Sequence, residues 1–267
     1  MIVKFTKEYV PAVLKFLEEN HVPENGLIIN CWLLESLCYK IHNDNYDPIY
    51  LHFSNNLIDG IVQVIIYDDD DKERLRRDFC LNLCSNNYAA TVELLNMPFS
   101  KGKVVNIDAE SPYVYQHLLT YFKKLPFNPA RDSFYIYFTY DRKPNFEIDY
   151  SKYDIREIPY DSGWENDYLY GLFVGDKLVS KCVIQEFPKS SVPQIKKHWC
   201  FSGLETEEEY RRKGYASVLT SYLTNKILER GGIPLYWAVH DNIASQRNAM
   251  KCGFSPIFKG INFTTIL

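Results

Sequence analysis

The sequence predicts an α/β fold of the α+β type, in which helices flank a mixed central sheet. An apolar run at 199–204 is followed by a basic, Gly-containing loop and a periodic helical segment at 218–228. A second apolar run at 235–239 precedes another segment of helical length. Strand and helix patterns that alternate in this way are typical of sheets covered by helices. Pro126 and Pro129 interrupt the regular patterns, so we place a domain boundary there. The expected domains are 1–127 and 128–267.

In the first half, apolar periodicity and turn residues predict the elements in order. Apolar residues spaced three and four apart within 10–17 form one stripe after Thr6, a residue type that caps helices. Ser54-Asn55-Asn56 is a turn signal between two strands. Ser111 is a second cap, and Pro112 occupies the favoured first helical position. The expected elements are a helix after Thr6, a helix at 31–39, strands at 49–53 and 60–67, a helix at 72–83, a strand at 104–107 and a helix at 112–124.

In the second half, two glycine signals organise the prediction. Gly175-Asp176 suits a tight two-residue turn between two strands. Gly231-Gly232 follows a periodic segment and is typical of a helix C-terminus. The expected elements are strands at 134–138, 168–174, 178–187, 199–204 and 235–239, a helix at 216–230, and a last strand pair near 256–267.

Composition excludes several function classes. The chain has 267 residues, a net charge of −4 and a pI of about 5.9, which argues against broad nucleic-acid binding. No apolar run approaches the ~20 residues that span a bilayer, and the N-terminus lacks the apolar core of a leader peptide. The seven cysteines are scattered without a C-x-x-C pair, so neither a disulfide framework nor a metal site is expected. We expect a cytoplasmic monomer or homodimer with no membrane or nucleic-acid partner.

Segment 209–217, Glu-Tyr-Arg-Arg-Lys-Gly-Tyr-Ala-Ser, has the chemistry of a diphosphate-binding loop. Amide groups at the start of a helix have no intrahelical partner, and the helix dipole places partial positive charge there. Gly214 lets the backbone approach a ligand closely. The side chains of Arg211, Arg212 and Lys213 add charge that pairs with phosphate. The loop is therefore predicted to bind a diphosphate.

The pattern Arg211-x-x-Gly214-x-Ala216 resembles the acyl-CoA-binding motif Arg/Gln-x-x-Gly-x-Gly/Ala of the GNAT (GCN5-related N-acetyltransferase) superfamily. A second block after the strand at 235–239 resembles the next conserved block of that superfamily. The residues that match are Asn242, Ser245, Ala249, Lys251, Gly253 and Phe254. The resemblance implies the GNAT fold, acetyl-CoA as cosubstrate, and transfer of an acetyl group to the amine of a small molecule or peptide.

Two hairpins, one in each half, are each followed by a further strand and helix. We therefore predict two GNAT-like domains in tandem. The first domain lacks the Arg/Gln-x-x-Gly-x-Gly/Ala pattern, so we interpret 1–127 as degenerate and expect it to bind no cofactor.

The resemblance also implies the residues that bind the cofactor. Main-chain groups at the end of the motif strand are expected to pair with the pantetheine arm, loop amides with the diphosphate, and the start of the second-block helix with the arm again. These residues are Leu204, Glu205, Thr206, Arg211, Arg212, Lys213, Gly214, Tyr215, Ala216, Ser217, Asn242 and Ser245.

The general base has several candidates. Glu205 and His240 are the catalytic candidates we retain, because both lie at strand ends beside the expected cofactor. His198, Asp241 or a water chain are alternatives. Many GNAT members carry a tyrosine acid where this chain has Ala249, which favours a second reading: a non-catalytic acyl-CoA-binding sensor or scaffold protein.

Overall fold

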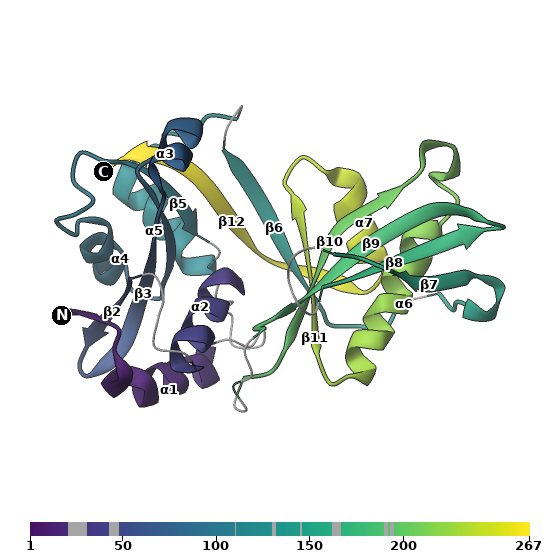
Figure 1. Cartoon of the computed structure of the whole chain (residues 1–267), viewed down its shortest axis with the longest axis horizontal. Helices are drawn as coiled ribbons and strands as arrows, with labels where there is room; N and C mark the ends of the chain where they lie inside the picture. Colours follow the sequence, from purple (N-terminus) through teal and green to yellow (C-terminus); the bar gives the residue numbers. More distant parts are fainter. Residues whose placement is uncertain are drawn as a thin grey trace. The chain divides into compact units, whose positions relative to one another are not determined.

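The computed structural model describes residues 1–20, 31–42, 48–109, 111–129, 132–144, 146–161, 167–189, 192 and 195–267. The chain forms two compact units (Figure 1). Unit 1 comprises Met1–Tyr135 and Phe258–Leu267 with Val192 and Ile195, and unit 2 comprises Ile136–Lys189 and Lys196–Ile257. Within the described stretches, no helix combines the length and apolar character needed to span a membrane.

Unit 1 contains a mixed sheet with the strand order β1-β2-β3-β4-β5-β12. Its strands are β1 (Ile2–Lys4), β2 (Ile49–Ser54), β3 (Leu57–Ile66), β4 (Phe79–Ser85), β5 (Val104–Ala109) and the C-terminal part of β12 (Phe254–Ile266). Its helices are α1 (Val10–Asn20), α2 (Cys31–His42), α3 (Asp69–Leu75), α4 (Tyr88–Leu95) and α5 (Pro112–Phe122). Strands β4 and β5 are parallel, and the other neighbours pair antiparallel.

Helices cover both faces of this sheet, because successive side chains of a strand point to opposite faces. On β3, Ile61 belongs to a core cluster with Val13 of α1 and Leu37 of α2. Its neighbour Val62 belongs to a second cluster with Leu118 of α5. All five side chains are fully buried. Apolar burial on both faces therefore fixes the register of the central strands.

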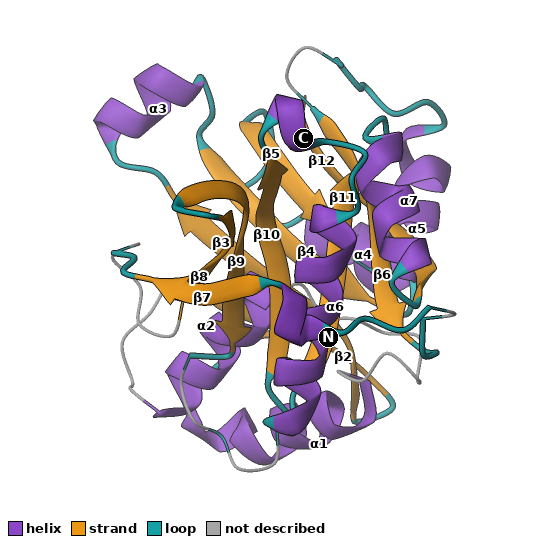
Figure 2. Cartoon of the chain, turned by 90° about the vertical axis from the view of Figure 1, so that its right-hand side faces the viewer, coloured by secondary structure: helices purple, strands orange, loops and turns teal. Residues whose placement is uncertain are grey.

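The strands of unit 2 also pair in a mixed arrangement, in the order β6-β11-β10-β9-β8-β7. Its strands are β6 (Ser133–Tyr140), β7 (Asp154–Ile158), β8 (Asp167–Val174), β9 (Lys177–Phe187), β10 (His198–Thr206) and β11 (Ile233–Val239). Its helices are α6 (Tyr215–Glu229) and α7 (Ile243–Lys251). Helix α6 packs on β9, β10 and β11, and α7 packs on β11 and α6 (Figure 2). Strands β10 and β11 are parallel, whereas β7, β8, β9 and β10 pair antiparallel in sequence.

The two units repeat one sequence of elements. In unit 1 the hairpin β2–β3 is followed by β4, α4, the parallel strand β5 and α5. In unit 2 the hairpin β8–β9 is followed by β10, α6, the parallel strand β11 and α7. The predicted α/β class, with mixed sheets flanked by helices in a tandem arrangement, is therefore confirmed.

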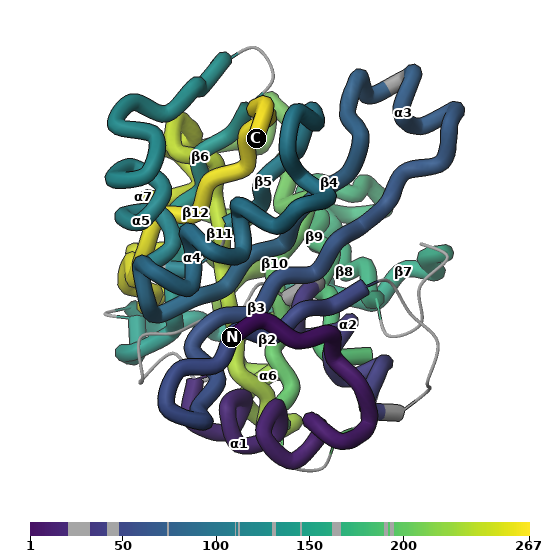
Figure 3. Tube along the Cα trace, turned by 90° about the vertical axis from the view of Figure 1, so that its left-hand side faces the viewer, coloured from purple at the N-terminus to yellow at the C-terminus, as the bar shows by residue number. Residues whose placement is uncertain are grey.

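The helix predicted at 72–83 is wrong in its second half. Helix α3 ends at Leu75, because Arg76 adopts a left-handed conformation with φ 53°. The chain then enters β4 at Phe79 (Figure 3). Cys80 and Cys84 therefore lie on this buried central strand.

The last strand pair predicted near 256–267 is one long strand, β12. Its C-terminal part pairs antiparallel with β5, from Ile261 opposite Ala109 to Ile266 opposite Val104 (Figure 3). Residues Phe258–Leu267 therefore belong to unit 1, although they are the last of the chain. The domain ranges 1–127 and 128–267 stay a prediction. The first compact unit extends to Tyr135 and also takes Val192, Ile195 and Phe258–Leu267. Helix α4 and strands β1 and β7 were not predicted.

Candidate acyl-CoA site in unit 2

The parallel strands β10 and β11 separate part-way along their length. Their paired residues run from His198 opposite Ile233 to Phe201 opposite Tyr236. Beyond Phe201, β10 continues to Thr206 while pairing only with β9 on its other side. A register shift between Ser202 and Glu205 accompanies this change. Because the pairing with β11 ends at Phe201, the edge of β10 that faces away from β9 has no strand partner beyond that residue among the described residues. The separation of the two strands thus lies beside Leu204, Glu205 and Thr206.

The basic loop forms an open turn at the start of α6. Arg212 and Gly214 have positive φ values of 62° and 90°, and Gly214 is the N-cap of the helix. A Cβ atom added at Gly214 would meet no heavy atom within 4 Å. The side chains of Arg211, Arg212 and Lys213 are exposed. The open space therefore lies against the unpaired first-turn amides, as a bound phosphate requires.

The three basic residues of the loop have different surroundings. Arg211 Nε donates a hydrogen bond to the carbonyl oxygen of Thr206 at 3.0 Å, so this side chain braces the loop against the end of β10. The ammonium of Lys213 lies 4.8 Å from the centroid of the Tyr210 ring. Lys177 lies 5.0 Å from the same ring and pairs with Glu209. Two ammonium groups therefore lie within cation–π distance of the Tyr210 ring.

Ser217 contributes its amide to the first turn of α6, whereas its side chain is used elsewhere. The residue is buried, and its hydroxyl donates to Asn248 Oδ1 at 2.9 Å. Asn248 Nδ2 in turn donates to Thr220 Oγ1 at 2.9 Å. Asn248 on α7 thus joins two hydroxyls of α6 and fixes the two helices that border the loop.

Asn242 caps α7, because its Oδ1 accepts a hydrogen bond from the amide of Ser245 at 3.1 Å. Ser245 Oγ lies 2.9 Å from the hydroxyl of Tyr236 on β11. Burial raises the pKa of Tyr236, so its hydroxyl stays protonated at neutral pH. The start of α7 is therefore anchored to the strand at the point where β10 and β11 separate.

Comparison with known proteins agrees with this geometry. Residues 198–261 match the model of the FR47-like protein family. A search of curated proteins gives no match. Solved structures match over nearly the whole chain. A GNAT acetyltransferase from Colwellia psychrerythraea superposes with a TM-score of 0.55 at 13% identity, covering 99% of both chains.

Two further structures extend this result. A GCN5-related N-acetyltransferase from Sphaerobacter thermophilus gives a TM-score of 0.54 at 10% identity, covering 99% of this chain and 95% of that one. A tandem GNAT protein from the clavulanic acid biosynthesis pathway gives a TM-score of 0.55 at 11% identity, covering 99% of this chain and 98% of that one. The chain has the tandem GNAT fold. These neighbours share the fold of the whole chain, and the FR47-like match covers residues 198–261 of it.

Within the GNAT fold, the two catalytic candidates both lie on the surface. Glu205 forms an ion pair with Lys181 on β9 at 3.2 Å, and the side chains of both residues are largely exposed. His240 is exposed just after β11, and its carbonyl oxygen accepts a hydrogen bond from Gln246 Nε2 at 2.7 Å. The alternative His198 is buried at the opposite end of β10, where that strand still pairs with β11. It lies seven residues before Glu205, roughly 20 Å along an extended strand.

Ala249, at the position where many GNAT members carry a tyrosine, belongs to the hydrophobic core. Ala249 is fully buried in a cluster that includes Leu219, Cys252 and Phe254. Two tyrosines of α6 lie nearby and could instead protonate the leaving thiolate. The ring of Tyr222 packs against Tyr150 and Tyr170, and that of Tyr215 lies 6.2 Å from the Tyr210 ring, centroid to centroid. The structure therefore places Tyr215, not Tyr222, next to the loop.

Sequence reasoning missed three residues of this site: Lys177, Tyr236 and Asn248. Asn248 carried a signal, because it falls on the same helix face as Ser245 and Cys252, at spacings of three and four. A polar side chain on a face that packs against other elements usually has hydrogen-bond partners there. The partners of Lys177 and Tyr236 come from segments separated from them in sequence, so no local pattern indicates them.

We expect Asn248→Leu to destabilise unit 2, because it leaves the hydroxyls of Ser217 and Thr220 without their partner. The expected loss is about 1–3 kcal/mol of unfolding free energy, measured by urea denaturation. Asn225→Ala is a matched control on α6, since Asn225 is exposed and bonds only weakly to Tyr150 at 3.3 Å. Equal effects of the two substitutions would contradict the assigned role of Asn248.

Proposed function

We propose that the protein is a GNAT-type N-acetyltransferase, which moves the acetyl group of acetyl-CoA to the amine of a small molecule or peptide. The observation that carries this proposal is the open turn at Gly214, set beside the point where β10 leaves β11. Main-chain amides of 212–217 would hold the diphosphate. The end of β10 at 204–206, which no longer pairs with β11, would offer main-chain groups to the pantetheine amides.

In the proposed reaction, the amine nitrogen attacks the thioester carbonyl carbon and the carbon–sulfur bond breaks. A main-chain N–H at the end of β10 would stabilise the negative charge that develops on the carbonyl oxygen. The amine must lose a proton, and the leaving thiolate must gain one. Holding the two reactants side by side supplies much of the acceleration in such a reaction. The products are an N-acetyl amine and free CoA.

Glu205 and His240 are the proposed bases. We expect Glu205→Gln to lower kcat about 100-fold with little change in acetyl-CoA affinity, because only proton transfer is lost. His240→Gln is measured in parallel. Lys181→Met is the control, since it removes the partner of Glu205 but keeps the carboxylate. If neither Glu205→Gln nor His240→Gln lowers kcat, the base is not one of these residues.

Ala249 favours a second candidate function, a non-catalytic sensor or scaffold that binds acyl-CoA. Release of free CoA in the presence of a panel of primary amines separates the two functions. An enzyme releases thiol faster than the background hydrolysis of the thioester. A sensor binds acetyl-CoA without turnover.

We further propose that the protein acts in the cytoplasm, since its seven cysteines are scattered and odd in number. We also propose that it is a monomer or homodimer.

A further inference from the structure

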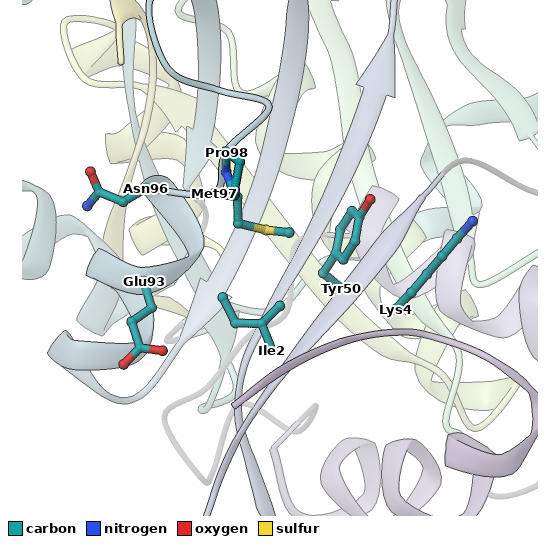
Figure 4. Close-up of a pocket in the computed structure, with 7 residues that line it drawn as sticks. All are labelled: Ile2, Lys4, Tyr50, Glu93, Asn96, Met97 and Pro98. Carbon is teal, nitrogen blue, oxygen red and sulfur yellow. The ribbon is translucent and has the colours of Figure 1, made fainter.

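Unit 1 contains two neighbouring hollows on the sheet face that carries α4 and α5. The first, of about 430 Å³, is lined by Ile2, Lys4, Tyr50, Glu93 and the segment 96–98 (Figure 4). The second, of about 360 Å³, shares the lining residue Tyr50 with the first. Both volumes fall within the range of small-molecule sites, which is about 300–1,000 Å³.

The second hollow has an aromatic wall. The rings of Tyr50 and Phe99 have centroids 5.6 Å apart, and Phe79 contacts Phe99 edge-on at 5.7 Å. Ile66 stands directly opposite Phe79 in the sheet and is 61% exposed, although it lines the hollow. An exposed branched aliphatic side chain beside three rings forms an apolar surface that a flat ligand would cover.

Two lysines supply positive charge at this hollow. Lys103 Nζ is 3.8 Å from Asp78 Oδ1, too far for a direct hydrogen bond, while Asp78 Oδ2 accepts the amide of Val104 at 2.7 Å. Lys72 Nζ pairs at 3.0 Å with Asp69, whose side chain is 99% exposed. Exposed pairs of this kind contribute little and are readily exchanged for another anion. The lining therefore combines two cations with one carboxylate, Asp78.

We propose that this hollow is a binding site for a small aromatic carboxylate, with the ring stacked on Tyr50 and Phe99 and the carboxylate between Lys72 and Lys103. All residues that line this site belong to unit 1, whereas the residues assigned to acyl-CoA belong to unit 2. The proposal therefore does not depend on the proposed acetyl transfer. The first domain of the tandem would thus recognise a ligand of its own.

The test is titration of the full chain with 2-naphthoate by isothermal calorimetry. We expect saturable binding with a Kd of about 0.1–1 mM, as the size of the ligand allows. The variants Lys72→Ala and Lys103→Ala should each weaken binding about threefold to tenfold, and the double variant further. Lys101→Ala is the matched control, because Lys101 is exposed two residues from Lys103 and does not line the hollow.

Two ligand controls complete the experiment. Neutral 2-naphthamide should bind at least about fivefold more weakly if the lysines recognise charge, and cyclohexanecarboxylate should bind more weakly if the rings recognise a flat ligand. Absence of saturable 2-naphthoate binding would overturn the proposal. So would equal affinities for 2-naphthoate in the parent, the double lysine variant and the Lys101 variant.

Discussion

Gly214→Val is expected to weaken acetyl-CoA binding about 100-fold or more, equivalent to about 2.7 kcal/mol. The added side chain enters the space beside the first-turn amides of α6, where a Cβ now meets no atom within 4 Å. A β-branched residue is also strained at the φ of 90° that Gly214 adopts. The backbone would therefore turn its amides away from the ligand as well as lose the space. Isothermal calorimetry with acetyl-CoA measures the loss.

Gly175→Val separates backbone strain from loss of the binding space. Gly175 lies in the β8–β9 turn with φ 59°, and a Cβ there also meets no atom within 4 Å. We expect it to lose about 1–2 kcal/mol of stability while keeping its affinity for acetyl-CoA. The affinity of Arg211→Ala for acetyl-CoA should fall between those of Gly175→Val and Gly214→Val, since the Arg211 side chain braces the loop through the Thr206 carbonyl. Unchanged affinity in Gly214→Val would remove the loop from the binding site.

The second large effect concerns stability. Gly253→Ala is expected to cost about 4 kcal/mol of unfolding free energy, because its added Cβ would overlap the carbonyl oxygen of Arg142 and approach the Tyr140 ring to 3.0 Å. The φ of 95° adds strain. The carbonyl oxygen of Gly253 accepts the amide of Asp141 at 3.2 Å, so the two segments are fixed against each other. Urea denaturation followed by circular dichroism measures the loss.

Gly102→Ala is the control for this substitution. Gly102 has a similar left-handed φ of 74°, but open space surrounds the position of its Cβ. Strain alone predicts a loss of about 1–2 kcal/mol. Losses of equal size in the two variants would show that the contact with Arg142 and Tyr140 is relieved by a small backbone movement.

The open turn at the start of α6 was predictable from sequence because its residues are close together in the chain. Gly214, the flanking basic residues and the start of α6 lie within ten residues of one another, and the structure gives Gly214 the left-handed backbone that this pattern requires. The links around the loop were not predictable. The bond of Asn248 to Ser217 spans 31 residues, and that of Arg211 uses a main-chain carbonyl, which leaves no trace in the sequence.

The errors in the fold have the same origin. Segment 72–83 has enough charged and aliphatic residues to resemble a helix, but 79–83 is buried between β3 and β5, partners that lie far away in sequence. Such tertiary pairing overrides local propensity. The assignment of Phe258–Leu267 to unit 1 depends on pairing with β5 across about 150 residues, and no local pattern indicates it.

Hydrogen–deuterium exchange of the full chain, with and without saturating acetyl-CoA, tests whether the turn at the start of α6 binds the cofactor. Amides of 212–217 and 204–206 should become protected when acetyl-CoA binds, while those of the β8–β9 turn at Gly175 should not change. Binding of acetyl-CoA with protection elsewhere and unchanged exchange at 212–217, or no binding at all, would contradict this prediction.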